Sequence, residues 1–151
     1  MTGWNRRGVF MLVIAGTAVA ALAMATPAPR PEIIVYKTST CGCCKKWVEH
    51  LQAAGFRVTA HDTSDVAGVA AHYGVPRRLS ACHTALVQGY VVEGHVPVDA
   101  IERLLKEGPD IAGVAVPGMP PGSPGMESET PAHYQILTFA KSGRTAVYGN
   151  R

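Results

Sequence analysis

The sequence lacks the excess of one charge that marks most nucleic-acid-binding proteins. Lysine and arginine together number 14, and aspartate and glutamate 11, so the formal net charge of the 151 residues is +3. Arg6 and Arg7 stand in an N-terminal segment whose removal would lower this charge from +3 to +1. The chain also lacks an internal repeat, and its length suits one domain. A basic nucleic-acid-binding protein and a repeat array are therefore excluded.

The first 25 residues carry the features of an export signal. Two arginines precede the uncharged stretch Gly8–Ala25, and Ala23-Met24-Ala25 provides the small residues that a signal peptidase reads. We therefore predict a signal peptide over residues 1–25, a proline-rich linker over residues 26–31 and a folded domain over residues 32–150. A retained membrane anchor is the alternative, because eighteen uncharged residues nearly span a bilayer. The paired arginines fit both the general and the twin-arginine export routes.

Cysteine is scarce, and its distribution is unusual for a structural role. Cys41, Cys43 and Cys44 fall within four residues, and Cys82 is the fourth cysteine. In an exported protein an even number of cysteines usually indicates disulfides. Here a Cys41–Cys44 bond would close so short a loop that it restrains little of the unfolded chain, and it would leave Cys43 to reach Cys82. Closely spaced thiols that contribute so little to the stability of the fold indicate a reactive or metal-binding role.

Strand-like and helix-like patterns alternate along residues 32–110. Strands are predicted over residues 33–36, 56–60, 84–87 and 90–92, and helices over residues 45–54, 64–73 and 97–107. Ser64 is the predicted cap of the second helix, and Gln88-Gly89 is a predicted two-residue hairpin turn. The order β-α-β-α-β-β-α, with cysteines between the first strand and the first helix, predicts an α/β fold with a thioredoxin-like core.

The residues after the third predicted helix do not continue this alternation of strands and helices. Residues 116–130 are rich in proline and glycine and are predicted to form a loop without regular structure that carries Met119 and Met126. Residues 134–140 and 145–148 are predicted to form a C-terminal β-hairpin. The predicted domain is therefore a thioredoxin-like core followed by a methionine-containing loop and a hairpin.

The cysteine cluster lies where thiolates are stabilised. Cys41 and Cys44 have C-x-x-C spacing, and Cys43 lies between them near the start of a predicted helix. Unpaired backbone N–H groups, the positive end of the helix dipole and the neighbouring Lys45 and Lys46 favour the deprotonated form. Such thiolates serve either disulfide exchange or the binding of soft metal ions. The third thiol favours metal, because an oxidoreductase needs two sulfurs whereas Cu(I) gains from each further sulfur that bridges ions.

The fourth cysteine is predicted to lie beside this cluster. In a thioredoxin-like fold the strand after the second helix runs antiparallel to the first strand, so Cys82 stands at the end of the sheet where the first helix begins. With a two-residue hairpin turn the ladder continues back until Cys82 faces His95, and directly opposed residues share one face of a sheet. His95 is therefore a candidate ligand. His83 is a further candidate, although the same geometry would point it to the other face if the strand extends that far.

Met119 and Met126 complete the set of candidate ligands. Thioethers are soft, neutral ligands that suit Cu(I) and bind Zn²⁺ poorly. The alternative is that these methionines cover an apolar patch. A four-cysteine zinc site is the main competitor, but zinc ligand pairs usually leave two or more residues between cysteines, which the adjacent Cys43 and Cys44 do not. The residue types therefore favour copper.

Four segments together match the motifs of a known family. They are Tyr36-Lys37-Thr38-Ser39-Thr40-Cys41-Gly42-Cys43-Cys44, Ala81-Cys82-His83-Thr84-Ala85, Gly94-His95-Val96-Pro97, and Pro117-Gly118-Met119-Pro120 with Gly125-Met126. On these motifs, residues 32–148 resemble the CopG-type copper-resistance proteins, long known only as a domain of unknown function. The resemblance implies a periplasmic, thioredoxin-like protein of Gram-negative bacteria that holds several copper ions and converts copper between Cu(I) and Cu(II).

The resemblance also implies a set of ligands. The family's C-x-C-C thiols fall on Cys41, Cys43 and Cys44, its later cysteine falls on Cys82, and the histidine of its Gly-His-Val-Pro segment falls on His95. The implied cofactor is copper, with more than one Cu(I) ion and with Cu(II) as a second state. The implied partners are copper ions and other periplasmic copper-handling proteins, with no nucleic acid and no membrane after signal cleavage.

Three functional hypotheses follow from the residues and the resemblance together. The first is a periplasmic copper-binding protein for copper resistance that interconverts Cu(I) and Cu(II). The second is copper sequestration or chaperoning without catalysis. The third is a thiol–disulfide oxidoreductase that uses Cys41 and Cys44.

Overall fold

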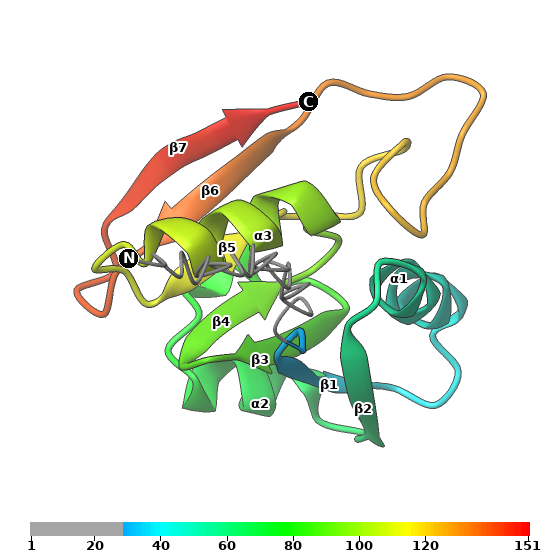
Figure 1. Ribbon diagram of the computed structural model, residues 1–151, viewed down its shortest axis with the longest axis horizontal. Coiled ribbons are helices and arrows are strands. Elements are labelled where there is room, and N and C mark those ends of the chain that lie inside the picture. The colour runs from blue at the N-terminus through cyan, green and yellow to red at the C-terminus, as the bar shows by residue number, and fades with distance from the viewer. Residues whose placement is uncertain (1–28) are drawn as a thin grey trace, which may run out of the picture.

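The computed structural model describes residues 29–151, whose seven strands form one mixed sheet (Figure 1). The strands are β1 (Glu32–Lys37), β2 (Arg57–Asp62), β3 (His83–Val87), β4 (Tyr90–Glu93), β5 (Gly113–Ala115), β6 (Gln135–Phe139) and β7 (Thr145–Asn150). The helices are α1 (Gly42–Ala53), α2 (Val66–His72) and α3 (Val98–Glu107), with a short 3₁₀ turn at Arg77–Leu79. The predicted signal peptide and the first half of the predicted linker, residues 26–28, lie outside the described residues.

The elements through α3 follow the predicted order β-α-β-α-β-β-α. The strands are arranged β2-β1-β3-β4-β5-β6-β7 across the sheet. β1 runs parallel to β2 and antiparallel to β3, so β3 begins at the end of the sheet where β1 ends and α1 begins. The predicted α/β class is confirmed, whereas a closer likeness to thioredoxin stays a prediction.

The predicted hairpin register is also confirmed. Val87 pairs with Tyr90 across a turn in which Gln88 and Gly89 both have positive φ, 46° and 85°. Two successive residues with positive φ form the type I′ turn, whose twist matches that of the two strands. This turn sets which residues of β3 and β4 face each other, and so brings the two ends of the hairpin back to α1.

β5 is a strand that the sequence did not predict. It pairs parallel with β4 and antiparallel with β6, so the predicted C-terminal hairpin of β6 and β7 extends the main sheet. Its three residues, one of them a glycine, are too few to show the alternation by which a strand is recognised in sequence. Pairing on both sides therefore creates the strand.

Helices cover both faces of the sheet. α1 and α3 pack on one face through buried side chains that include Trp47, Leu51, Ile101 and Leu104. α2 covers the other face, where Ala70 belongs to a second buried cluster. Burial of one such large apolar side chain contributes roughly 1.5–3 kcal/mol, so the first cluster holds α1 firmly against the sheet.

Two helix starts differ from the prediction. α1 begins at Gly42 with Cys41 as its N-cap, three residues before the predicted Lys45, because the apolar periodicity used for the prediction starts only inside the helix. Cys43 and Cys44 therefore occupy the first helical turn. The cap of α2 is Asp65 and not the predicted Ser64, since Asp65 Oδ1 accepts a hydrogen bond from Gly68 N at 2.8 Å.

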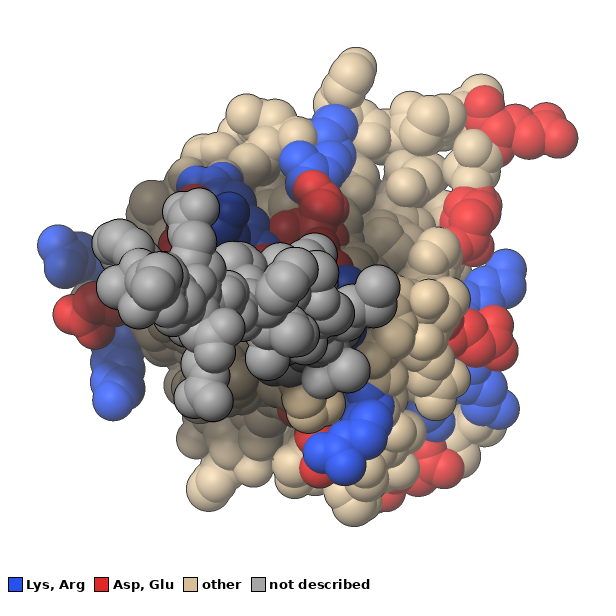
Figure 2. All heavy atoms as spheres, viewed as in Figure 1, with Lys and Arg blue, Asp and Glu red and all other residues tan. Residues whose placement is uncertain are grey.

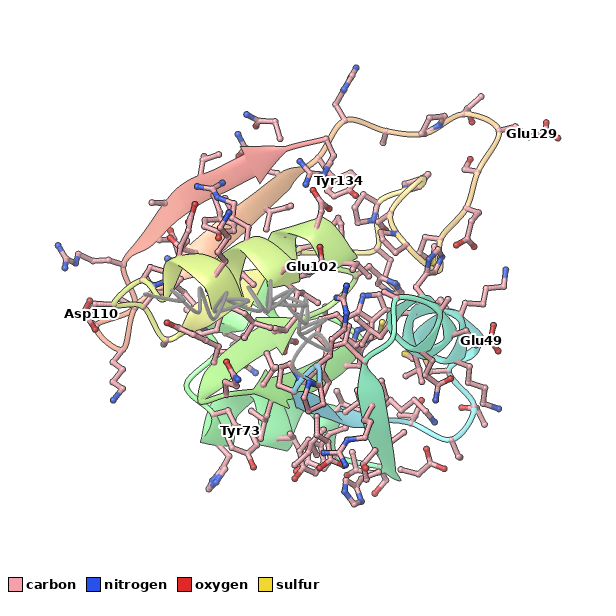
Figure 3. The ribbon with its side chains drawn as sticks, in the orientation of Figure 1. Glu49, Tyr73, Glu102, Asp110, Glu129 and Tyr134 are labelled. Carbon is pink, nitrogen blue, oxygen red and sulfur yellow. A yellow bond between two sulfur atoms is a disulfide. The ribbon has the colours of Figure 1, made fainter. Side chains whose placement is uncertain are left out.

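Charged side chains are distributed over the surface of the described residues. Figure 2 shows lysines and arginines interspersed with aspartates and glutamates on the face in view. Glu49, Asp110 and Glu129 are exposed and point away from the body of the protein (Figure 3). None of the helices among these residues is both long enough and apolar enough to cross a membrane.

Candidate metal centre

The four cysteines converge at the start of α1. Cys41 and Cys44 form a disulfide, and their Cα atoms are 5.3 Å apart. Cys43 Sγ lies 3.5 Å from Cys41 Sγ and 4.0 Å from Cys82 Sγ. All four sulfur atoms lie within 4.8 Å of one another, although Cys82 follows Cys44 by 38 residues. The prediction that Cys82 lies beside the cluster is confirmed.

The spacing of the sulfurs suits a soft metal ion. With a metal–sulfur bond of about 2.3 Å, two sulfurs at the corners of a tetrahedral site are about 3.8 Å apart. The separations of Cys43 Sγ from its two neighbours, 3.5 and 4.0 Å, bracket this value. In the disulfide-bonded form Cys41 and Cys44 are engaged with each other, so reduction is required before all four sulfurs act as thiolate ligands.

Two buried histidines contact Cys82. His95 Nε2 lies 3.1 Å and His83 Nδ1 lies 3.5 Å from Cys82 Sγ. Both rings are fully buried, and their centroids are 5.0 Å apart in an edge-on arrangement. The structure therefore brings one sulfur and two imidazoles together, as the sequence predicted for His95.

His83 also points into this site, because the strand geometry that would have turned it to the other face does not extend that far. The pairing of β3 with β4 ends at Thr84 and Glu93, and Gly94 then turns the chain with a φ of 71°. Cys82 stands before β3, so strand alternation between Cys82 and His83 does not apply. A side chain at Gly94 would also lie 2.7 Å from Val116 O, so the turn that places His95 requires glycine.

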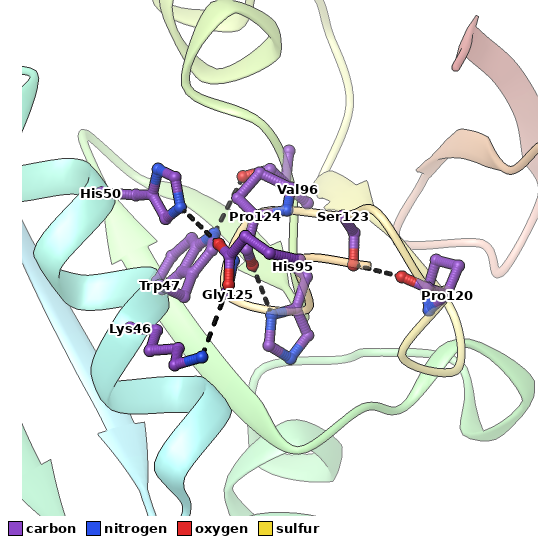
Figure 4. Close-up of polar contacts among 10 residues, drawn as sticks. Lys46, Trp47, His50, His95, Val96, Pro120, Ser123, Pro124 and Gly125 are labelled. Atoms are coloured by element: carbon purple, nitrogen blue, oxygen red, sulfur yellow. Dashed lines mark hydrogen bonds and ion pairs between the residues drawn. The ribbon is translucent and has the colours of Figure 1, made fainter. Parts of the chain in front are cut away.

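His95 is held in the tautomer that a metal ligand needs. Its Nδ1–H donates to Pro124 O at 2.8 Å (Figure 4). Because a carbonyl only accepts, the neutral ring carries its proton on Nδ1 and presents the lone pair of Nε2 to Cys82. Burial lowers the pKa of His95 below its usual value, which favours this neutral form.

The pKa of Cys82 is shifted in the opposite direction from that of a thiol at a helix N-terminus. Burial raises the pKa of its thiol to about 12, and the neighbouring Cys43 acts in the same direction. In the absence of a metal ion Cys82 is therefore a neutral thiol at pH 7. Binding of a cation must displace its proton, which makes the affinity for metal ions increase with pH.

His83 is the more deeply enclosed histidine. Burial, followed by the proximity of His95, lowers the pKa of His83 to about 3. The ring packs against Trp47 with centroids 4.3 Å apart. Within residues 29–151, His83 Nε2 is a buried side-chain nitrogen without a hydrogen-bond partner. His83 therefore stays neutral and keeps a nitrogen lone pair at the site.

The stability that neutral His83 contributes to the metal-free protein is expected to be lost as the pH falls below 6.5. Unfolded His83 takes up a proton near its usual pKa of 6.5, whereas the folded side chain does so only near 3, so its contribution is present above pH 6.5 and is lost below it. The loss amounts to about 2 kcal/mol at pH 5. Urea unfolding of the wild type and of His83→Phe at pH 7 and pH 5 measures this loss as the difference between the two proteins, because Glu93, whose pKa is raised, contributes with the opposite sign in both. An equal change in both proteins would contradict the assignment.

Glu93 is a buried residue of the site that sequence reasoning missed. Its carboxylate accepts hydrogen bonds from Ala81 N and from Thr84 Oγ1, both at 2.7 Å. These two bonds fix the segment that carries Cys82 and His83. Burial raises the pKa of Glu93 to about 7. The available signal was a charged residue at the end of the apolar strand Tyr90-Val91-Val92-Glu93.

Replacing Glu93 with leucine is expected to lower the free energy of unfolding by about 3 kcal/mol, because part-buried Ala81 N and the buried Thr84 hydroxyl both lose their acceptor. Glu93→Gln is the matched variant. Its amide oxygen still accepts from Ala81 N, and its NH₂ group donates to the Thr84 hydroxyl, so most stability is retained. Chemical denaturation at pH 8 compares the two variants. Equal destabilisation by both would show that the hydrogen bonds to Glu93 do not hold this segment.

The methionine-containing loop folds over the cluster. In Figure 1 it passes above α1, and in Figure 4 its contacts join α1 to His95. Glu127 accepts hydrogen bonds from His50 Nε2 at 2.8 Å and from Gly125 N at 2.7 Å, which hold the pKa of its carboxyl at about 2. Half-buried Met126 lines a surface pocket with Cys43, whereas Met119 is 48% exposed. Met126, and not Met119, therefore lines the same surface pocket as a cysteine of the cluster.

The comparisons with known proteins agree with this geometry. A family described as "Protein of unknown function, DUF411" matches residues 79–126. A solved structure described as copper resistance protein CopG, form 2, is 43% identical to this chain with a TM-score of 0.77, over 81% of this chain and 98% of that one. Form 1 is 44% identical with a TM-score of 0.76, over 82% and 98%. Among curated proteins none matches.

The chain belongs to the CopG family. Residues 79–126 contain Cys82, His83, His95 and both loop methionines, so the matched segment of unknown function is one half of the site and the C-x-C-C motif is the other. The predicted resemblance is confirmed. The roles of the individual side chains as ligands stay predictions.

Proposed function

We propose that this protein takes part in copper resistance by binding Cu(I) on the thiolates of Cys41, Cys43, Cys44 and Cys82. The observation that carries the proposal is the gathering of these four sulfur atoms within 4.8 Å. The CopG relatives, which are described as copper resistance proteins, support the choice of copper. The metal ion is the substrate that the protein holds. His95 lies beside the thiolate of Cys82, and Met126 lines the pocket next to Cys43.

The arrangement of the sulfurs favours Cu(I) over Zn²⁺. Adjacent Cys43 and Cys44 leave no intervening residues with which to wrap a single ion, whereas neighbouring thiolates suit Cu(I) ions that share bridging sulfurs. Met126 beside Cys43 offers a thioether, a ligand that selects Cu(I). We therefore propose more than one copper ion per chain, with Met119 too exposed to be a ligand in this conformation of the loop.

The disulfide supports a role in interconverting Cu(I) and Cu(II). Reduced Cys41 and Cys44 together hold two electrons, so the dithiol and two Cu(II) ions yield one disulfide, two Cu(I) ions and two protons. The disulfide observed between these residues is the product form of that reaction. A thiol reductant from a partner protein would restore the dithiol. This proposal places the protein in the periplasm after removal of residues 1–25, together with other copper-handling proteins.

Anaerobic titration with Cu(I) tests the proposal, and the chain provides its own control. The fully reduced protein is expected to bind more than one Cu(I) per chain tightly. The protein with an intact Cys41–Cys44 disulfide lacks two of the four thiolates and is expected to bind fewer ions more weakly. Equal binding by the two forms, or weak binding by both, would overturn the thiolate cluster.

A second candidate function rests on the same disulfide. Cys41 caps α1 and Cys44 lies in its first turn, which is the arrangement that thiol–disulfide oxidoreductases use. Under this alternative Cys41 and Cys44 exchange disulfides with a protein substrate, and Cys82 is not required. Reduction of insulin by the dithiol form distinguishes this activity from copper binding.

A further inference from the structure

β7 is the edge strand at the opposite end of the sheet from β2 (Figure 1). Among residues 29–151 it pairs with β6 alone. Every second residue of an edge strand directs its N–H and C=O groups away from the sheet, where a further strand can pair with them. Edge strands usually carry charged residues or proline that prevent such pairing. The six residues of β7, Thr145-Ala146-Val147-Tyr148-Gly149-Asn150, include neither.

The first half of β7 is both regular and exposed. Thr145, Ala146 and Val147 pair in register with β6, whereas a bulge at Tyr148 shifts the register of the second half. The three residues before the bulge are exposed, and Val147 is 53% exposed. At the bulge, the carbonyl of Tyr148 accepts a hydrogen bond from Arg103 Nη1. Residues 145–147 therefore form the stretch to which a further strand can be added.

Val147 gives this stretch an apolar contact point. It lies directly opposite Leu137 on β6, so the two side chains share one face of the sheet. Leu137 packs against the second buried cluster, to which Phe139 belongs. A strand added beside β7 would continue this face and cover Val147 with one of its own side chains.

Cations without an acidic partner surround the start of β7. Arg144 directly precedes the strand, and Lys141 lies in the turn between β6 and β7. Arg78 reaches the same place, where its Nη2 donates to Gly143 O at 3.0 Å and to Thr145 Oγ1 at 3.2 Å. Within residues 29–151, none of these three cations forms a salt bridge. Acidic groups of a partner would therefore be attracted to this end of the strand.

The charges along β7 also set the orientation of the partner. At the far end of the strand, Arg103 is already paired with Glu107, and Arg151 with Asp99. The attraction for acidic groups is therefore concentrated at the Arg144 end. In an antiparallel pair this end lies beside the C-terminal end of the added strand, so the acidic residues of the partner belong there.

A second copy of this chain does not supply those acidic residues. Antiparallel pairing of two β7 strands would bring Arg144 of one copy toward Arg151 of the other, which leaves Arg144 without an acidic partner. The other edge strand, β2, ends in Asp62, but the carboxylate of Asp62 is already paired with Lys37. The charges therefore favour a different protein as the partner.

We propose that β7 is a docking site for an extended, acidic segment of another protein, which adds to the sheet as an antiparallel strand beside residues 145–147. Main-chain hydrogen bonds would hold the segment, a side chain over Val147 would fix its register, and its carboxylates would pair with Arg144 and the neighbouring cations. β3, β4, β5 and β6 lie between β7 and β1, so this partner would dock away from the start of α1. The inference does not depend on copper binding.

Two synthetic peptides test the docking site. The probe is acetyl-Thr-Val-Thr-Val-Glu-Glu-amide, and its control carries two lysines in place of the two glutamates. In NMR titrations of the isotope-labelled protein, the acidic peptide is expected to shift the backbone amide resonances of residues 144–147. It should bind about fivefold more tightly than the basic peptide. This preference should shrink at high salt, because exposed charges are screened.

Charge reversal at Arg144 gives the sharpest comparison. In Arg144→Glu the basic peptide should bind more tightly than the acidic one. Arg57→Glu is the matched control, because Arg57 is exposed at the start of β2, the other edge strand, and it should keep the wild-type preference. Val147→Asn should weaken the binding of both peptides about fivefold, because it removes the apolar contact point. Urea unfolding shows whether each variant keeps the wild-type fold.

The proposal is supported if residues 144–147 respond and the preference reverses in Arg144→Glu. Equal affinity for the two peptides, resonance shifts confined to other residues, or no response at millimolar peptide would overturn it. Concentration-dependent self-association of the wild type that the acidic peptide prevents would also overturn it, because β7 would then bind a second copy. These measurements are made without copper, so their failure leaves the proposed function untouched, and failure of the Cu(I) titration leaves the docking site untouched.

Discussion

Replacing Cys82 with serine is expected to lower the affinity of the reduced protein for Cu(I) by about tenfold or more, which corresponds to about 1.4 kcal/mol or more of binding free energy. It should also reduce the number of Cu(I) ions held per chain. Cys82 Sγ lies 4.0 Å from Cys43 Sγ and 3.1 Å from His95 Nε2, so it is the sulfur that joins the helix cluster to the histidines. Anaerobic titration against a competing Cu(I) chelator measures both quantities.

Cys44→Ser is the informative companion to Cys82→Ser. Both variants should lose Cu(I) affinity if the four sulfurs form one cluster. If the protein is an oxidoreductase, Cys44→Ser should lose insulin reduction, because the Cys41–Cys44 disulfide can no longer form, while Cys82→Ser should keep it. A Cys82→Ser protein with unchanged Cu(I) affinity and stoichiometry would remove the thiolate cluster from consideration and leave disulfide exchange as the function.

Replacing Gly125 with alanine is expected to cost about 3 kcal/mol of unfolding free energy and to separate the loop from the site. The added Cβ would lie 2.6 Å from Cys43 O, 3.0 Å from Trp47 N and 3.4 Å from His95 Nδ1, and the φ of Gly125 is 86°. Because two of these atoms are backbone of α1, the clash cannot be relieved by a side-chain rotation. The His95–Pro124 hydrogen bond should break, and Cu(I) affinity should fall with it.

Gly118→Ala is the matched control for Gly125→Ala. Gly118 lies in the same loop with a φ of 77°, but a Cβ there would have no atom within 4 Å. It therefore reports the cost of positive φ alone, about 1–2 kcal/mol. Denaturant unfolding of both variants, with Cu(I) titration, gives the contribution of the close approach by difference. Equal effects of the two substitutions would show that the loop does not need to contact α1.

The element order was predictable because it depends on local patterns. Apolar periodicity over a few residues distinguishes strand from helix, and the Gln88-Gly89 turn fixes the pairing of Val87 with Tyr90 whatever surrounds it. β5 and the start of α1 were missed for the same reason. Three residues of β5 form a strand only through their neighbours, and the first turn of α1 holds cysteines that show no apolar periodicity.

The residues of the candidate site likewise fall into those that local sequence patterns predict and those that depend on tertiary contacts. Cys41, Cys43 and Cys44 lie within four residues, so a thiol cluster at the start of a helix could be predicted from local patterns, and antiparallel pairing of β1 with β3 was enough to bring Cys82 to it. The meeting of His83 with His95 at Cys82 could not be predicted in this way. That outcome depends on where the β3–β4 ladder stops, and the ladder stops because the chain turns at Gly94 against Val116, a residue far along the sequence.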